Sequence, residues 1–274
     1  MLSVNTNVGA MAALQSLNQT QTDLQMTQSH INSGLKVATA KDNGAVYAIA
    51  QNMRGNVAGY AAVSDSLNRG VSTVDVAISA GQSISDLLNE LKGKALAAAD
   101  SSLDTASRNA LNADFTALRD QITTIVQNAS FNGTNLVDGT TANFQALASA
   151  DGTKKITAAG QTLKLSGAIV TVKTTSTIST QAKASTMVST VNASIQNVNA
   201  SLAKLASGSK KFSIQASFVS KLVDTLNAGI GNLVDADMAV ESAKLQSLQV
   251  KQQLGIQALS IANAAPSITL SLFR

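Results

Sequence analysis

The sequence contains no cysteine and no tryptophan, and only one proline among its 274 residues. The absence of cysteine excludes disulfide bonds, thiol catalysis and metal sites built on thiolates. Because a proline interrupts a helix by removing a backbone donor, a single proline leaves room for very long helices. Aromatic residues make up 3% of the chain, against 45% hydrophobic residues. This balance suits thin seams between helices better than a thick core filled with rings.

Charged side chains are also scarce, at 13% of the residues, which is about half of the usual share. The polar surface must therefore come from Ser, Thr, Asn and Gln, which cost less to remove from water than a charge does. Such a surface favours association with a neighbour. The net charge of +4 comes from dispersed lysines, with no cluster larger than a pair such as Lys210 and Lys211, so nucleic-acid binding is not expected.

The N-terminal sequence lacks the basic and apolar regions of a cleaved signal peptide. The sequence also has no uncharged apolar run long enough to span a bilayer, so no membrane insertion is expected. Taken alone, these two features would place the protein in the cytoplasm.

The strongest periodic pattern runs from Val188 to Leu233, where apolar residues recur at alternating intervals of three and four. A mean spacing of 3.5 keeps one stripe on a single face of a helix and is typical of coiled coils. No proline interrupts the stretch. The pattern therefore predicts one long helix whose stripe other parts of the chain must cover.

Similar spacing predicts helices in residues 1–36, 45–100 and 105–129, and in a last segment from about 238 to 265 that Pro266 is expected to end. We expect residues 45–129 to cover the long helix by antiparallel packing. The two terminal helices carry few charges and have apolar surfaces broader than one partner can cover. Their composition predicts contacts between subunits.

The texture changes between Phe131 and Thr180. Three turn dipeptides occur there, Asn132-Gly133, Asp138-Gly139 and Asp151-Gly152. Two stretches alternate with period two and predict short strands, residues 161–166 and 169–174. The hydroxyl-rich run of residues 174–180 is interpreted as a solvated linker. The predicted fold is mainly α, a long antiparallel helical hairpin or coiled-coil bundle with a small β region in the middle of the chain.

No group of side chains predicts catalysis. His30 is the only histidine, and no cluster suitable for a general base or a metal ligand surrounds it. Asp235, Asp237 and Glu241 precede or begin a predicted helix, where carboxylates serve as caps and meet the helix dipole. We therefore predict no catalytic, cofactor-binding or metal-binding residues, no cofactor and no enzyme activity.

Four motifs carry a resemblance to a known family. They are residues 3–7 with 33–43, residues 131–139 (FNGTNLVDG), residues 235–241 (DADMAVE), and the closing stretch 262–274. In order and sequence they resemble bacterial flagellin. The resemblance implies an inner terminal coiled-coil domain of residues 1–40 plus 236–274. It also implies a helical shaft domain of residues 41–235, with a β-hairpin region at about 131–180 and no large outer domains.

The resemblance further implies a structural subunit that self-assembles into the extracellular flagellar filament used for motility. It also implies export through the flagellar type III apparatus without a cleaved signal peptide, with an export chaperone and a filament cap as partners. Export of this kind replaces the cytoplasmic interpretation. A hook–filament junction protein, which shares both ends of the pattern, stays open as an alternative. A helical signalling rod is the more distant one.

Two sets of residues follow from this interpretation. Self-assembly is assigned to apolar residues of both ends: Val4, Val8, Leu14, Leu17, Leu24, Ile31, Leu245, Leu248, Leu254, Leu259, Ile261, Leu270, Leu272 and Phe273. O-glycosylation, known in some flagellins, is assigned to hydroxyls of the central region: Thr171, Thr174, Thr175, Ser176, Thr177, Ser179 and Thr180.

One stretch departs from the family. Where flagellins often have Gln-Arg-x-Arg-Glu-Leu-Ala-x-Gln, residues 89–97 are NELKGKALA. Glu90 replaces a cation, Gly93 removes a carboxylate, and Lys94 adds a charge where leucine is usual. Flagellin-sensing Toll-like receptors bind this region in the family, so the resemblance predicts weak recognition.

Overall fold

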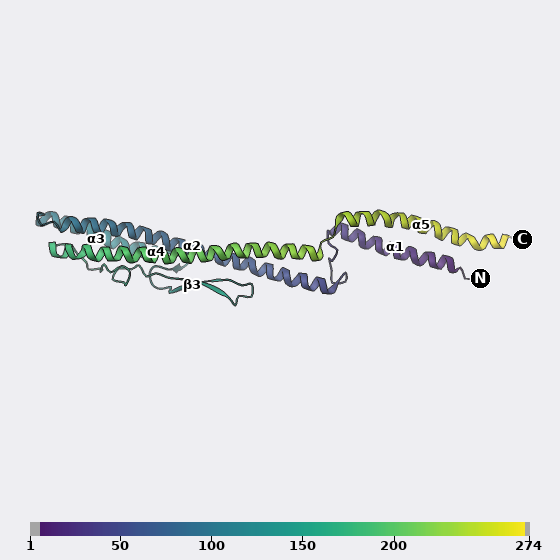
Figure 1. Cartoon of the computed structure of the whole chain (residues 1–274), viewed down its shortest axis with the longest axis horizontal. Helices are drawn as coiled ribbons and strands as arrows, with labels where there is room; N and C mark the ends of the chain where they lie inside the picture. The colour runs from purple at the N-terminus through teal and green to yellow at the C-terminus, as the bar shows by residue number, and fades with distance from the viewer. Residues whose placement is uncertain (1–5, 272–274) are drawn as a thin grey trace. The chain divides into compact units, whose positions relative to one another are not determined.

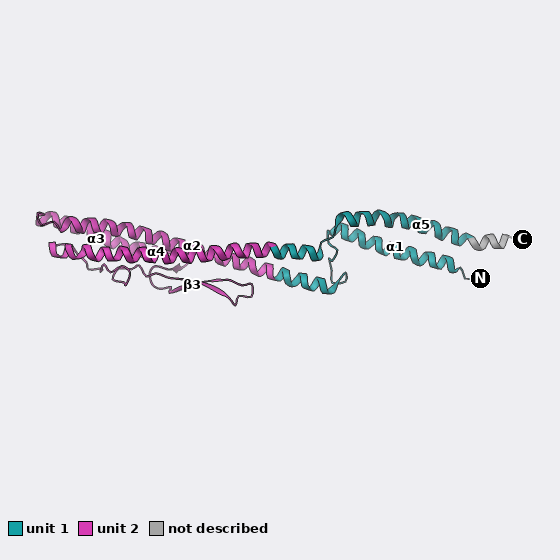
Figure 2. Ribbon diagram, in the orientation of Figure 1, with its two compact units in different colours: residues 1–55, 225–274 teal, residues 56–224 magenta. Residues whose placement is uncertain are grey.

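The computed structural model describes the backbone of residues 6–271 and the side chains of residues 6–264. The described chain is mainly helical, as predicted (Figure 1). Its helices are α1 (Val8–Ser33), α2 (Gly44–Ala98), α3 (Thr105–Asn128), α4 (Gln181–Val234) and α5 (Met238–Ser271). Two compact units are formed, residues 1–55 with 225–274 and residues 56–224 (Figure 2).

The bundle of residues 56–224 is built around α4. Every seventh residue of this helix is buried, namely Val191, Val198, Leu205, Phe212 and Val219. This heptad row packs in one apolar cluster with side chains of α2 and α3. The prediction of one long helix covered by the segments before it is therefore confirmed.

Two small antiparallel sheets lie between α3 and α4. β1 (Ser130–Phe131) pairs with β2 (Thr134–Asn135), and β3 (Asn143–Leu147) pairs with β4 (Lys155–Ala159). Asn132 and Gly133 join β1 to β2 with φ angles of 48° and 76°. Positive φ at both central residues is what a two-residue hairpin turn needs, and Asn-Gly supplies it at low cost. This turn is confirmed.

The strands predicted at residues 161–166 and 169–174 are not formed, and the prediction was wrong. The alternation itself is present, because Leu163, Leu165, Val170 and Val172 are buried in the bundle's apolar cluster. The backbone, however, finds other partners: the Leu163 N–H donates to the Val137 carbonyl at 2.7 Å. Alternation of apolar and polar residues indicates which side chains of an extended segment are buried, and does not indicate that the segment pairs with a neighbouring strand.

The run 174–180 is not a solvated linker, which corrects the second interpretation of this region. The Ile178 side chain is buried, and its N–H donates to Asn112 Oδ1 of α3 at 2.7 Å. The Arg119 guanidinium donates to the Ser176 carbonyl at 2.8 Å. These contacts fasten the run to α3.

In the unit formed by both chain ends, α1 and α5 run antiparallel, side by side (Figure 1). Gln21 pairs with Gln252, and Asn7 donates to the Ala262 carbonyl, each at 2.6 Å. The connectors beside these helices also pair, since the Ala236 N–H donates to the Gly34 carbonyl at 2.8 Å. The two chain ends are thereby held in one register.

Pro266 does not end α5, which continues to Ser271. The prediction that this proline stops the helix was wrong. A proline removes one backbone donor at its own position, and the residues on either side can still continue the helix. The cost falls on one turn of the helix.

Candidate assembly surfaces

The seam between α1 and α5 holds part of the predicted self-assembly set. Leu24 of α1 and Leu248 of α5 are buried. Leu17, Ile31, Leu245 and Leu259 are half-buried, and Leu17 lies against Gly255. Within a single chain these six side chains hold the two terminal helices together.

Other members of the set lie outside the seam. Val8 is 70% exposed and Ile261 is 72% exposed, and Leu14 and Leu254 are also exposed. Full burial of such a side chain from water contributes about 1.5–3 kcal/mol, so burying the parts that are still exposed would contribute roughly half to two thirds of that. Val4, Leu272 and Phe273 lie outside the described residues, and Leu270 lies outside the described side chains.

Sequence reasoning left further exposed apolar residues out of the assigned set. They are Met11 and Met26 on α1, and Met238, Val240, Val250 and Ile256 on α5. A partial signal was present for all of these except Met238, because they lie off the row that recurs at intervals of three and four in their helix. Position on the row does not decide exposure, since Leu14 and Met238 lie on it and are exposed.

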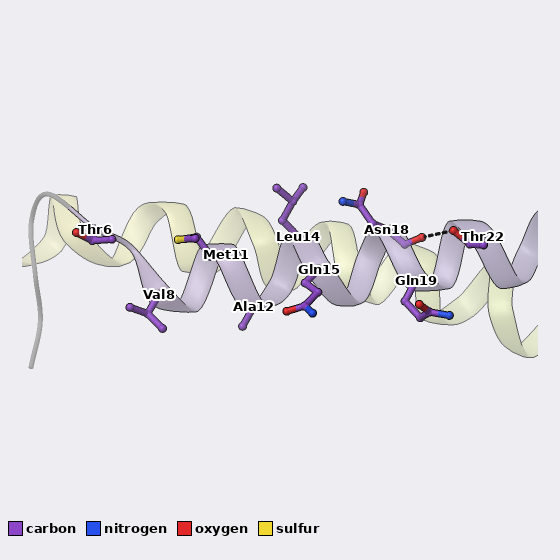
Figure 3. Close-up of a pocket in the computed structure, with 9 residues that line it drawn as sticks. All are labelled: Thr6, Val8, Met11, Ala12, Leu14, Gln15, Asn18, Gln19 and Thr22. Carbon is purple, nitrogen blue, oxygen red and sulfur yellow. Dashed lines mark hydrogen bonds between the residues drawn. The ribbon is translucent and has the colours of Figure 1, made fainter.

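An open groove of about 820 Å³ runs along the exposed side of α1 (Figure 3). Its apolar lining comes from Val8, Met11, Ala12 and Leu14. Its polar lining is uncharged and comes from Thr6, Gln15, Asn18, Gln19 and Thr22. The Thr22 hydroxyl already donates to the Asn18 carbonyl at 3.0 Å. A surface without charges can be covered by a neighbour at little desolvation cost.

A buried polar pair joins the other ends of these helices. His30 Nδ1 of α1 lies 3.1 Å from Glu241 Oε1 of α5, and both side chains are largely buried. Glu241 therefore holds His30, whereas Asp237 caps the helix by accepting from the Ala239 N–H at 2.9 Å. Glu241 lies in the first turn of α5, where a carboxylate also meets the helix dipole. A polar pair inside an apolar seam disfavours other registers of the two helices.

The connector after α1 is closed by one carboxylate. The Thr39 N–H donates to Asp42 Oδ2 at 2.8 Å, and the Ala38 N–H donates to the same atom at 3.0 Å. The hydrogen bond from the Thr39 backbone lowers the pKa of Asp42 below its ordinary value. The carboxylate therefore stays ionised to a lower pH than an isolated aspartate would, and it keeps the turn closed.

Across the described residues, no group of three or more His, Asp or Glu side chains could hold a metal ion.

The hydroxyls assigned to O-glycosylation differ in access. Thr174, Thr175 and Thr180 are exposed, whereas Ser176, Thr177 and Ser179 are half-buried. Thr171 is half-buried, and its Oγ1 lies 3.0 Å from the Ser194 hydroxyl. The exposed three offer the most accessible oxygens.

Residues 89–97 lie on α2 near its end. Glu90 is exposed, Leu96 is 61% exposed, and Lys94 Nζ lies 2.6 Å from Asp114 Oδ2 of α3. The charge of Lys94 is therefore partly neutralised by an ion pair within the chain.

None of the described helices is long and apolar enough to cross a membrane.

Comparison with known proteins identifies relatives along the whole chain. The family models for the bacterial flagellin N-terminal and C-terminal helical regions match residues 4–142 and 188–273. Flagellin FljM of Caulobacter vibrioides is 53% identical over 278 positions, covering 99% of this chain and 98% of that protein. A flagellin of Brucella melitensis is 34% identical over the full length of both. The crystal structure of Bacillus cereus flagellin aligns with a TM-score of 0.42 at 20% identity, covering 65% of this chain and 92% of that one.

Proposed function

The chain belongs to the bacterial flagellin family, and from that membership we propose that it assembles by burying the exposed apolar faces of α1 and α5 against neighbouring copies. As a flagellin it is a structural protein and not an enzyme. It polymerises with itself into the extracellular filament of the bacterial flagellum, which serves motility.

One observation carries the proposed mechanism. Both terminal helices have large apolar side chains outside the seam that joins them, including Val8 and Leu14 on α1, and Leu254 and Ile261 on α5. Several large apolar side chains left exposed on one helix pair indicate an interaction site. A single antiparallel pair has no further face with which to cover it. Other copies of the chain supply the cover.

We assign residues 1–40 and 236–274 to an inner coiled-coil domain that lines the filament channel, and residues 41–235 to the surrounding shaft. The boundaries at 40 and 236 fall at the paired connectors, where α1 and α5 meet the rest of the chain. This assignment is supported by the composition of the terminal helices, which carry few charges and are suited to tight packing.

The test is polymerisation of the purified chain on short filament seeds, followed by light scattering and electron microscopy. Long filaments are expected. Scattering that stays flat with seeds of the same protein would contradict the proposed mechanism. The assay also separates the nearer alternative, because a hook–filament junction protein would not extend into long filaments by itself. A helical signalling rod would not polymerise.

Further partners follow from the same membership as proposals. The chain would leave the cell unfolded through the flagellar type III apparatus, with an export chaperone, and would be added beneath a filament cap. A terminal helix with little charge is marginally stable alone, which suits passage in an unfolded state. Loss of secretion in a strain without this apparatus is the expected result, and normal secretion there would contradict it.

We predict weak activation of flagellin-sensing Toll-like receptors by the monomer. The expected cause is the sequence of residues 89–97, where Glu90 and Lys94 change the charge pattern that the receptors meet in other flagellins. The measurement is reporter activation in receptor-expressing cells, with a receptor-competent flagellin as the reference. Activation equal to the reference at the same concentration would show the prediction to be wrong.

O-glycosylation of filaments isolated from the producing cells is proposed at the exposed hydroxyls of Thr174, Thr175 and Thr180. The intact mass should exceed that of the bare sequence by whole sugar residues. The triple variant Thr174→Ala/Thr175→Ala/Thr180→Ala should lose most of this excess. An intact mass equal to the bare sequence rules the modification out.

A further inference from the structure

The excess of positive over negative charge in this protein falls on one helix. α4 contains five lysines and one aspartate, a balance of +4 that equals the net charge of the whole chain. The residues outside α4 therefore carry no net charge. In a protein with so few charges, a helix that carries the entire net charge has an electrostatic preference for an acidic surface.

Three of these lysines and two large apolar side chains share one stripe of α4. Lys204, Lys211, Ile214, Phe218 and Lys221 follow each other at intervals of three, four and seven, and fall within about 100° of arc. All five are exposed, and Ile214 and Phe218 are 58% and 55% exposed. Phe212, by contrast, points into the core. The stripe is a surface of mixed apolar and cationic character.

A groove borders this stripe. It has a volume of about 460 Å³ and lies between α4 and strand β4, with Lys204, Gly208 and Lys211 on one side and Thr157, Ala158 and Gln161 on the other. An opposing helix could enter this hollow and bring its own charges close to both lysines.

An acidic row lies on α2 of the same unit. Asp65, Asp75, Asp86 and Glu90 are exposed and fall within about 80° of arc, opposite the buried Leu67, Val74 and Leu88. Arg69 lies beside Asp65 on this helix, and Lys92 and Lys94 follow Glu90. The described structure has no ion pair that involves Asp65, Asp86, Lys204 or Lys211.

The stripe and the acidic row lie on different sides of the unit. Asp75 Oδ1 accepts from the Ser209 hydroxyl at 3.1 Å, which places Ser209 on the flank of α4 that meets α2. Lys211 follows Ser209 by two residues, a rotation of about 200° around the helix. The stripe therefore points away from the acidic row of its own chain. The two surfaces can meet only between different molecules.

We propose that the α4 stripe of one copy docks on the acidic row of α2 of a second copy. The contact is head-to-tail, because it joins two different surfaces, and a head-to-tail contact that does not close builds an open helical polymer. Ile214 and Phe218 supply apolar burial at its centre, and the charges set its register and exclude the like-charged alternatives. This inference rests on the proposed self-assembly and names the surfaces that it uses in residues 56–224.

The test is charge reversal with seeded polymerisation at low salt, where screening is weak. Lys204→Glu/Lys211→Glu should raise the critical concentration about tenfold, because each contact changes from attraction to repulsion at two positions. Lys164→Glu/Lys173→Glu changes the net charge equally, and its two exposed sites lie outside both the stripe and the groove. This control should polymerise like the unmodified chain.

Rescue supplies the decisive comparison. The chain with Lys204→Glu/Lys211→Glu/Asp65→Lys/Asp86→Lys inverts both surfaces and keeps the original net charge, so its critical concentration should return to within about twofold of the unmodified value. An equimolar mixture of Lys204→Glu/Lys211→Glu with Asp65→Lys/Asp86→Lys, each tested for normal thermal unfolding, should polymerise at a concentration where neither double variant does alone. This mixture serves if the fourfold variant fails to fold.

Three results would overturn the proposal. They are an unchanged critical concentration for Lys204→Glu/Lys211→Glu, an equal loss in the control, and no rescue by either route. Normal polymerisation combined with weaker retention on a polyanion column would instead assign the stripe to an anionic polymer. If the unmodified chain fails to polymerise at all, the proposed function fails, and that outcome is distinct from the failure of this contact.

Discussion

A chain that lacks residues 1–36 is expected to remain soluble and helical but to form no filaments, even on seeds of the intact protein. The deletion removes α1, and with it the exposed Val8, Met11 and Leu14. It also uncovers the α5 side of the seam at Leu248. The bundle of residues 56–224 keeps its own apolar cluster, so its helices should stay folded. Removing residues 240–274 should have the same effect through α5.

The measurements are light scattering for polymerisation and circular dichroism for the remaining helix. Because deletion removes the seam as well as the exposed face, the variant Leu14→Asp separates the two causes. It places a charge on the groove of α1 and leaves the buried Leu24 in place. Hydrogen exchange along α1 should be unchanged while addition to seeds is lost. Filament formation by either truncated chain would refute the role of the terminal helices.

Heptad periodicity predicted the bundle well, for a physical reason. The residues at positions 191, 198, 205, 212 and 219 are all apolar and all buried, because a seam between two helices selects side chains at one fixed interval. The turn at Asn132-Gly133 was equally predictable, since two successive positive φ angles restrict the residue types strongly. Features that depend on nearby residues can therefore be predicted from the nearby sequence.

Features set by distant partners were not predictable in this way. His30 and Glu241 are separated by 211 positions, and neither residue's neighbours indicate the pair. The same holds for residues 161–178, whose backbone bonds go to Val137, Asn112 and Ser194. An alternating pattern was visible there, and its most common cause, a paired strand, was not the cause in this fold.

The candidate site shows a related limit. Leu24 and Val8 both look like members of an assembly surface in the sequence, yet one is buried against α5 and the other is exposed. A periodic row shows that a face is apolar, and the partner of that face is known only when the helices are placed. The sequence therefore predicted the assembly helices, whereas the assembly side chains had to be sorted by their exposure.

The replacement Phe212→Ala is expected to destabilise the bundle by about 3–5 kcal/mol, the usual cost of removing a buried ring. The ring is fully buried and meets Phe144 of β3 edge-on, with centroids 6.0 Å apart at 78°. Gly70 of α2 lies against both rings, and a Cβ atom there would lie 3.1 Å from the Phe144 ring and 3.2 Å from the Phe212 ring. Since glycine has no side chain that could move into the space, the cavity should stay open. The midpoint of thermal unfolding should fall by roughly 6–20 °C.

Phe218→Ala is the matched control, because the same side chain is removed six residues further along the same helix. Phe218 is 55% exposed, so the free energy of unfolding should change by less than about 0.5 kcal/mol. Its effect should appear in polymerisation, as a higher critical concentration, since the ring lies in the α4 stripe that is proposed to dock on a second copy. Calorimetry of the monomers and seeded scattering of both variants measure the two effects. If Phe212→Ala and Phe218→Ala lower the free energy of unfolding equally, the prediction is wrong. Exposure would then not distinguish the α4 residues that stabilise the bundle from those that contact neighbouring copies.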